Sequence, residues 1–440
     1  MKKTAVLLLF YVALSFILIL LYLPANDLHP DEAHYWVWST RPQAGYFDNS
    51  PMIALFIRAS TSVFGKNEFG VRFPAALAFL VLNILLYLLA FRITKRRETA
   101  FLGVFLYASM PIVMTGSHII THDTPLILFA TLTWVFVYRA AVEGKKASWY
   151  WAGACLGLAL ASKYQAALAG LSIFLLLLAR KEFRKQLTKK EPWLAMFAAF
   201  LIFTPTLYWN YRHHWVSFAF QLSHGVQLEA RSDFANILKF YAGQMAIASP
   251  LFLLAIIYYA VKKLFHLRTL TRNETFLMAG LKLPPGTIMT NQLHGWKELG
   301  RALGGIIDER RGTAGKTVIF AENYGLASEI LFYTRRPVEV LATPCGRLNQ
   351  FGLWTLPAID AYAGQNGLLV FEDERVLRQL DGYFARITKI RDFVPVRFGT
   401  AIRRVHIYAV DGIKAAAIRE AILQKNLGYA TKPYLKGHKP

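Results

Sequence analysis

Apolar stretches of membrane length recur along the first 262 residues of the chain. The first, at 4–24, is almost wholly apolar and reaches about the 20 residues that cross the hydrocarbon core of a bilayer. The pattern predicts eight spans, at about 4–24, 71–91, 99–117, 123–142, 149–162, 165–180, 192–209 and 237–262. We therefore expect a polytopic α-helical membrane protein.

Two further segments differ from these spans. Residues 46–69 are less hydrophobic and carry Asp48, Arg58 and Lys66, which suits a helix along the membrane surface. From about 284 the apolar runs shorten and charges mix with them. This pattern predicts helices 296–311, 324–333 and 373–384 and strands 316–321, 338–341, 367–372, 386–393 and 404–410. A multi-span membrane domain at 1–275 would then precede a soluble α/β domain at 284–440.

Composition and charge support a membrane protein. Of the 440 residues, 55% are hydrophobic, and the mean hydropathy is +0.33. The net charge of +23 lies largely in short loops between apolar runs, at 2–3, 92–97, 145–146, 180–190 and 262–272. This positive-inside pattern places the N-terminus in the cytoplasm and 25–70 in the first outward-facing loop. It also removes the reason to expect nucleic-acid binding.

Side chains suited to chemistry gather in the outward-facing loops. They include carboxylates, aromatic rings and cations, at Asp31, Glu32, Tyr46, Asp48, Arg58, Arg72, His122, Asp123, Lys163 and Tyr164. A carboxylate can take the proton of an attacking hydroxyl. Arg and Lys can hold a leaving phosphate, and aromatic faces can pack on a sugar ring or a prenyl tail. The combination suits transfer of a sugar from a lipid phosphate.

Several of these residues have other interpretations. On helical spacing, His118, His122 and Asp123 would share a face and could bind a divalent metal. We assign no residue as a metal ligand on this spacing alone. Asp123-Thr124-Pro125 also has the pattern of a helix start. Lys163 could simply extend to the membrane interface. The two cysteines, Cys155 and Cys345, have no metal-binding or disulfide spacing.

Three motifs near the N-terminus resemble a known group of enzymes. Pro30 to Trp36, Gly45 to Met52 and Gly70 to Pro74 are similar to membrane glycosyltransferases related to the protein O-mannosyltransferases. The nearest relatives would be the bacterial lipid A aminoarabinose and galacturonic acid transferases. The same pattern continues at 121–125 and 157–164, and 295–299, 322–325 and 349–354 resemble the C-terminal periplasmic domain of the family.

The resemblance implies a GT-C fold in the bacterial inner membrane, with a periplasmic active site. The donor would be a sugar on undecaprenyl or another polyprenyl phosphate, and the acceptor lipid A, another glycolipid or a protein. By position, Asp31 is the candidate base with Glu32 beside it, and Asp123 is the second acidic motif. Arg58, Arg72 and Lys163 are candidates for the donor phosphate. Transfer would invert the sugar without a covalent intermediate.

The chain departs from the family pattern after Lys262, where relatives continue with further membrane helices. Here the α/β pattern follows almost at once, which suggests an internal loss of helices near 270–285. Eight spans would leave the α/β domain in the cytoplasm, whereas the resemblance implies the periplasm. Loss of an odd number of helices, or a crossing by 275–290, would reconcile the two. A lipid-linked sugar transporter or flippase and a truncated, non-catalytic relative are the alternative functions.

Overall fold

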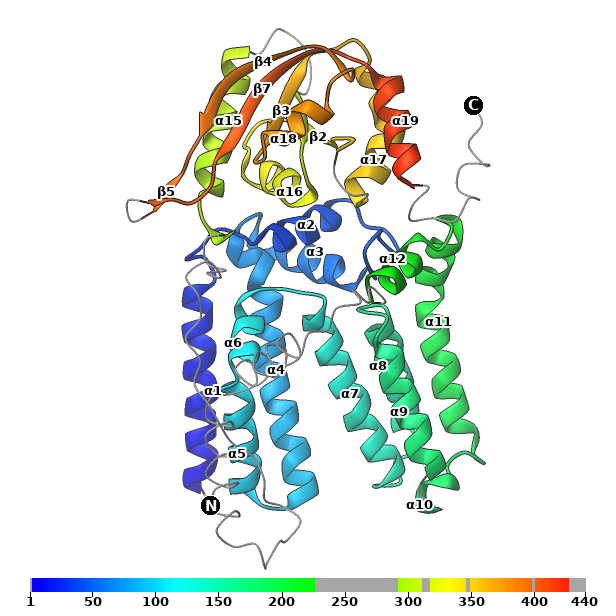
Figure 1. Ribbon diagram of the computed structural model, residues 1–440. Helices are drawn as coiled ribbons and strands as arrows, with labels where there is room; N and C mark the ends of the chain where they lie inside the picture. Colours follow the sequence, from blue (N-terminus) through cyan, green and yellow to red (C-terminus); the bar gives the residue numbers. More distant parts are fainter. Residues whose placement is uncertain are drawn as a thin grey trace, which may run out of the picture.

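The computed structural model describes residues 2–179, 181–225, 292–310, 317–345, 349–397 and 400–426. A bundle of helices forms one end of the molecule and a sheet with its covering helices forms the other (Figure 1). The predicted span 237–262, the basic segment 262–272 and the predicted loss near 270–285 lie outside the described residues.

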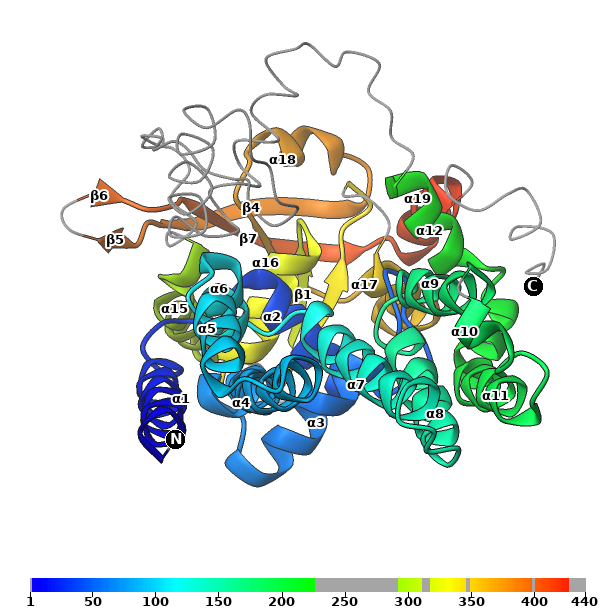
Figure 2. The same ribbon diagram turned by 90° about the horizontal axis from the view of Figure 1, so that it is seen from below.

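The longer helices of the bundle run roughly side by side, and shorter ones join or cap them (Figures 1 and 2). They are α1 (Lys2–Tyr22), α4 (Glu68–Thr94), α5 (Arg97–Ala108), α6 (Pro111–His118), α7 (Asp123–Ala141), α8 (Ser148–Leu160), α9 (Ala166–Ala179), α10 (Lys181–Arg184), α11 (Lys190–Arg212) and α12 (Val216–Gly225). Within the described residues, α4, α7 and α11 are long and apolar enough to cross a membrane. Seen from below, α7 lies between α4 and α8 (Figure 2).

The predicted span at 99–117 is not one continuous helix. The structure breaks it into α5 and α6, which meet at an angle of 67°. The break falls at Ser109-Met110, directly before Pro111 at the start of α6. Proline lacks an N–H for the preceding turn and disfavours helical geometry at the residue before it. As expected, 149–162 and 165–180 form two separate helices, α8 and α9.

Residues 25–70 contain two helices: one falls within 46–69, where the sequence predicted a helix, and the other falls in the part expected as loop. Helices α2 (Pro30–Thr40) and α3 (Met52–Phe64) lie across the end of the bundle, between it and the sheet (Figure 1). His29 caps α2: its ring accepts a hydrogen bond from Asp31 N, and the Glu32 carboxylate accepts one from His29 N. This capping box, with Pro30 in the first turn, explains why the helix begins here.

The C-terminal part is a five-stranded sheet of order β2-β1-β3-β7-β4. Its strands are β1 (Thr317–Ala321), β2 (Val338–Ala342), β3 (Gly367–Phe371), β4 (Phe384–Phe393) and β7 (Val405–Ile413). Strand β1 runs parallel to β2 and β3, and β7 runs antiparallel to β3 and β4. Strands β5 (Val396–Arg397) and β6 (Thr400–Ala401) form a ladder that projects sideways from the sheet (Figure 2).

Alternating side chains of the sheet serve two hydrophobic cores. In β1, Ile319 and Ala321 face a core with α15 (Trp296–Arg310) and α16 (Tyr324–Tyr333), whereas Val318 and Phe320 face one with α18 (Arg375–Gln379) and α19 (Ala415–Asn426). Period-two alternation explains this two-sided burial. The pattern did not predict α17 (Gln350–Ala358), η3 (Ile359–Tyr362) or α19, and the predicted helix 373–384 is reduced to α18.

Both cores continue into the helical part. Val37 of α2 joins the first, and Phe47, Trp209 and Phe220 join the second. The sheet layer therefore packs on the end of the bundle that carries Asp31, away from the N-terminus (Figure 1). The count of eight spans would have put it at the opposite end.

Candidate active site

Asp31 lies in the first turn of α2, and its side chain is 41% exposed. Tyr324, at the start of α16, donates a hydrogen bond from its hydroxyl to Asp31 Oδ1 over 2.9 Å. Asp31 Oδ2 lies 3.7 Å from His29 Nδ1, beyond hydrogen-bonding distance, and accepts no hydrogen bond within the described part of the chain. One carboxylate oxygen is thus held in place while the other is free to accept a proton.

Glu32, the neighbour of Asp31, is fully buried and saturated with hydrogen bonds. Arg72 donates from Nε to Oε1 over 3.0 Å and from Nη2 to Oε2 over 2.7 Å. The backbone N–H groups of His29 and Ile120 donate to the same carboxylate. The pair therefore ties together α2, α4 and the segment before α7. This geometry favours a positioning role for Glu32 over the catalytic role expected from the sequence.

Arg72 has no donor left for a substrate. Besides Glu32, its guanidinium donates to the carbonyl oxygens of Leu23, Asn26 and Asp27 at 2.7–2.9 Å. These contacts use the N–H groups of Nε, Nη1 and Nη2, which are all that a guanidinium offers. The geometry therefore speaks against the expected contact of Arg72 with a donor phosphate.

Asp123 and Lys163 form an ion pair at the rim of the bundle. Lys163 Nζ lies 2.8 Å from Asp123 Oδ1, and both side chains are partly exposed. Asp123 is the first residue of α7, as its helix-start pattern predicted, and Lys163 follows the end of α8. Helices α8 and α11 approach closely because Gly153 and Gly157 lack side chains: a Cβ on Gly153 would lie 2.1 Å from Ala195 O.

Carboxylates from three segments of the chain lie close enough to Tyr35 to influence its phenol. Burial raises the pKa of the Tyr35 phenol well above its usual value of 10.0, and the negative charges of Asp31, Asp48 and Asp123 raise it further. Asp48 Oδ2 lies 3.5 Å from Nε2 of His34, a residue on the same helix as Asp31. The site therefore combines several negative charges with the cation Lys163.

His122 packs inside this site as a neutral ring. It lies against Tyr35 and Trp38, with ring centroids 4.6 and 5.5 Å apart. Burial lowers the pKa of His122 to about 3, and the charge of Lys163 contributes to this shift. At neutral pH the imidazole carries no charge to attract a phosphate, so any contribution to substrate binding rests on its shape and polarity.

The remaining predicted binding residues lie in different surroundings. Tyr46 is buried, stacks on Trp38 at 4.3 Å and donates to Trp38 O, so it supports the core. Tyr164 is half-buried, and its hydroxyl lies 2.7 Å from Ser217 Oγ. Arg58 is exposed and donates to Ser39 O, which lies along α2 by a rise of about 12 Å from Asp31.

The described residues hold no group of three or more His, Cys, Asp or Glu side chains that could bind a metal. The metal alternative for His118, His122 and Asp123 assumed one helical face. Helix α6 instead ends at His118, whose ring Nδ1 lies 2.7 Å from Met114 O, and α7 begins only at Asp123. The non-helical segment between them takes His118 out of the helix that begins at Asp123, so the single helical face that this alternative assumed does not form.

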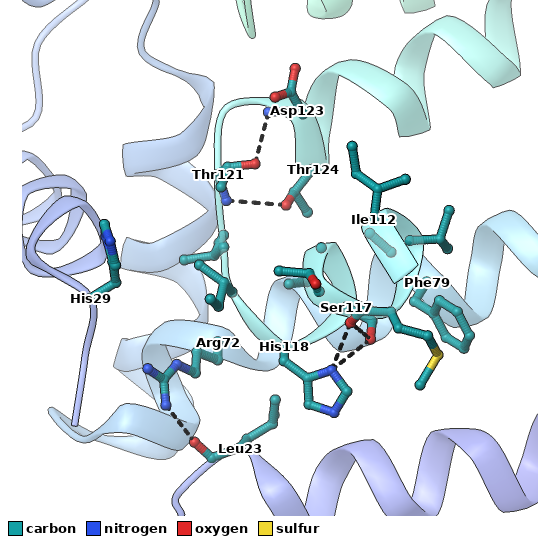
Figure 3. A pocket seen from close by; sticks show the side chains of 18 of the residues that line it. Leu23, His29, Arg72, Phe79, Ile112, Ser117, His118, Thr121, Asp123 and Thr124 are labelled. Atoms are coloured by element: carbon teal, nitrogen blue, oxygen red, sulfur yellow. Dashed lines mark hydrogen bonds between the residues drawn. The ribbon is translucent and has the colours of Figure 1, made fainter. Parts of the chain in front are cut away.

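A cavity of about 800 Å³ opens beside Asp31 among α1, α4, α5, α6 and α7. Asp31, His29 and Asp123 are among its polar lining residues, and Phe79, Leu82 and Ile127 are among its apolar ones. Figure 3 shows Asp123 and Thr121 at one end and His118 and Phe79 toward the other. A mostly apolar cavity with a few polar groups suits an amphipathic ligand. Tyr324 was not predicted as a site residue, because no local sequence pattern indicates that α16 packs on α2.

The chain is similar in sequence to several known proteins. Residues 48–209 match the family described as dolichyl-phosphate-mannose-protein mannosyltransferase. The lipid A galacturonosyltransferase of Rhizobium johnstonii is 25% identical over 289 residues, which cover 62% of this chain and 57% of that protein. An undecaprenyl phosphate-alpha-4-amino-4-deoxy-L-arabinose arabinosyl transferase of Proteus mirabilis is 28% identical, over 39% of this chain and 32% of that protein.

Solved structures show the same fold. ArnT from Cupriavidus metallidurans in the apo state superposes with a TM-score of 0.55 at 15% identity, over 93% of this chain and 98% of that one. The same protein bound to undecaprenyl phosphate gives 0.53 at 14% identity, over 91% and 97%. The chain spans little more than half the length of the galacturonosyltransferase. Part of the chain is therefore similar to the dolichyl-phosphate-mannose-protein mannosyltransferases, and its fold is that of ArnT, which agrees with the resemblance seen in its sequence.

Proposed function

We propose that the protein is an inverting glycosyltransferase that moves a sugar from a polyprenyl-phosphate donor to an envelope acceptor. The observation that carries this proposal is the half-exposed carboxylate of Asp31, a residue that lines a mostly apolar cavity of about 800 Å³. A base at the edge of a lipid-sized cavity suits a reaction between membrane-bound substrates.

In the proposed reaction, Asp31 Oδ2 removes the proton from the acceptor hydroxyl. The oxygen of that hydroxyl attacks the anomeric carbon of the sugar as the proton leaves. The bond between that carbon and the phosphate oxygen breaks, and the phosphate leaves with the electron pair. Attack opposite the leaving phosphate inverts the configuration, so no sugar–enzyme bond forms. The lipid phosphate departs already charged and needs a cation more than a general acid.

Lys163 is the cation that we assign to the phosphate. Its ammonium group lies in the carboxylate-rich site and is held by Asp123 at 2.8 Å. Arg72 is fully used by Glu32 and backbone carbonyls, and Arg58 donates to the carbonyl of Ser39, about 12 Å along α2 from Asp31. In this assignment Asp123 orients Lys163, and the Glu32–Arg72 pair fixes the start of α2.

A location in the inner membrane accounts for the arrangement of the helices. Helices α4, α7 and α11 would cross the bilayer, with α2 and α3 at its outer surface. The basic loops 92–97 and 145–146 would face the cytoplasm. Asp31 and the sheet layer would then face the periplasm. Charges that gather at one end of the bundle favour transfer over transport, because transporters bind their substrates near the midplane.

The related proteins support the choice of substrates. One is named a lipid A galacturonosyltransferase, and another is named for undecaprenyl phosphate-linked 4-amino-4-deoxy-L-arabinose. ArnT, whose fold is similar, has been solved with undecaprenyl phosphate. We therefore propose an undecaprenyl-phosphate sugar as donor and lipid A as acceptor, with another glycolipid or a protein as alternative acceptors.

The test is a transfer assay with purified protein in lipid nanodiscs. Radiolabelled undecaprenyl-phosphate galacturonic acid and undecaprenyl-phosphate 4-amino-4-deoxyarabinose are each offered with lipid A. We expect a labelled lipid product that the Asp31→Asn variant does not form. Asp308→Asn, which alters an exposed ion pair with Arg336 on the sheet layer, serves as the control and should keep activity. Absence of product from both donors, with folded protein, would refute the proposed donor class.

A further inference from the structure

We propose that Tyr324 is a positioning residue for Asp31, so that the sheet layer completes the active site of the bundle. The inference rests on the proposed function, because it assigns Asp31 the role of base. It adds that the C-terminal part is needed for the chemical step as well as for stability. The contact joins residues 293 positions apart, and no local pattern of the sequence indicates it.

Three consecutive residues, Asn323, Tyr324 and Gly325, position the hydrogen bond between Tyr324 and Asp31. The Asn323 side chain caps α16 by accepting a hydrogen bond from Leu326 N over 2.9 Å. Gly325 lets the helix start approach α2, since a Cβ at this position would lie 2.9 Å from Pro30 Cβ. Tyr324, between them, donates its hydroxyl to Asp31 Oδ1. Each of the three residues thus helps to place the phenol at the carboxylate.

A second contact, one turn further along α16, keeps the two helices in register. Ser328 Oγ lies 3.3 Å from His34 Nδ1, and the Tyr324 ring lies 4.7 Å from the His34 ring. His34 is buried and follows Asp31 by three residues, so it lies on the same face of α2. The seam between α2 and α16 is therefore packed on the side that presents Asp31.

The geometry at Asp31 distinguishes positioning from mere docking. A half-exposed carboxylate without a donor samples several rotamers, whereas a phenol bound to Oδ1 fixes its plane. Oδ2 then stays free of hydrogen bonds within the described residues, beside the cavity. A base must lie within hydrogen-bond reach of the proton it removes, so an orienting partner acts on the rate of the chemical step.

Tyr333, at the other end of α16, provides a matched comparison. Its hydroxyl accepts from Leu28 N over 2.8 Å and donates to Glu68 Oε1 over 3.1 Å. It also links the sheet layer to the bundle but forms no contact with Asp31. Tyr324→Phe and Tyr333→Phe each remove one bridging hydroxyl, and only the first should affect the reaction directly.

The experiment compares both variants with wild type in nanodiscs, using radiolabelled undecaprenyl-phosphate sugars and lipid A. We expect Tyr324→Phe to lower kcat roughly ten- to a hundredfold with KM for the donor unchanged, the range expected for a misplaced catalytic group. Tyr333→Phe should keep kcat. Wild-type kcat in Tyr324→Phe, or an equal loss in both variants, would overturn the inference. A wild-type protein without transfer would instead refute the proposed function.

A double-mutant cycle tests the contact without turnover. The unfolding midpoint is measured for Tyr324→Phe, Asp31→Ala and the double variant. Residues in contact give non-additive changes. We expect the double variant to lose less than the sum of the two single losses. Strict additivity would show that the two side chains do not interact, and would overturn the inference whether or not the protein transfers sugar.

Discussion

Arg72 binds both carboxylate oxygens of Glu32, which lies 40 positions earlier in the chain, and both side chains are buried. The pair lies directly beside the exposed Asp31. Of two adjacent acidic residues, one is therefore held inside the protein by an ion pair, and the other is left partly exposed. Desolvation of both ions is offset only while the pair is intact.

Breaking this pair should destabilise the protein strongly. We expect Glu32→Gln to lower the free energy of unfolding by roughly 3–5 kcal/mol, because it leaves a buried guanidinium without its counter-charge. The measurement is denaturant unfolding in detergent micelles. The exposed pair of Arg92 and Glu143 is the control, and Glu143→Gln should cost about 0–1 kcal/mol. A small loss for Glu32→Gln would contradict the structural role of the pair.

Removing the charge of Lys163 should weaken donor binding. We expect Lys163→Met to reduce the affinity for undecaprenyl phosphate roughly tenfold or more, since a charged hydrogen bond contributes about 1.5–3 kcal/mol. The measurement is equilibrium binding of radiolabelled undecaprenyl phosphate to protein in nanodiscs. Lys145→Met removes an exposed charge near Glu143, and its affinity should match wild type. Equal affinity in Lys163→Met would show that another group holds the phosphate.

Glu329 should make stability depend on pH. Its side chain is buried in α16, and neither carboxylate oxygen has a hydrogen-bond partner within the described residues. Burial raises the pKa of Glu329 well above its usual 4.5, and the negative charges of Asp27 and Glu32 add to the shift, while Arg403 and Arg72 oppose it. The folded protein therefore holds a proton that the unfolded chain releases above about pH 4.5.

The sign of the effect follows from this proton. The contribution of Glu329 to stability is fully present below about pH 4.5 and is lost as the pH rises toward its folded pKa. We expect Glu329→Gln to resemble wild type at pH 4.5 and to be more stable at pH 8, measured as unfolding midpoints across this range. Parallel pH profiles for the two proteins would show that Glu329 titrates alike in both states.

Gly325 should be intolerant of a side chain. A Cβ would meet Pro30 Cβ at 2.9 Å and push α16 away from α2. We expect Gly325→Ala to cost roughly 1–3 kcal/mol, the usual range for overpacking. Gly305→Ala in α15 is the matched control, because open space surrounds that position. It should stabilise the protein by roughly 0.5–1 kcal/mol. If both substitutions shifted the unfolding midpoint in the same direction, the result would contradict the close approach of α16 to α2.

The sequence by itself determined the long helices and the end of the bundle at which the candidate site residues lie. Apolar runs of membrane length are a local property, so α4, α7 and α11 could be predicted without knowledge of their neighbours. Loops between successive spans alternate between the two sides, which is why Asp31, Asp123 and Lys163 were expected on one rim. The strands of the sheet layer followed from short β-prone runs.

Only the tertiary structure decided which partners each of these residues has. In the structure, Asp31 and Glu32 lie in a helix, and Arg72 forms an ion pair with Glu32. Tyr324, 293 positions away in the sequence, forms a hydrogen bond with Asp31. The structure also separates His118 from Asp123 by ending α6. Hydrophobic periodicity reports which face of an element is buried. The partner of a buried charge or a catalytic oxygen depends instead on which elements pack together, and the local sequence does not contain that information.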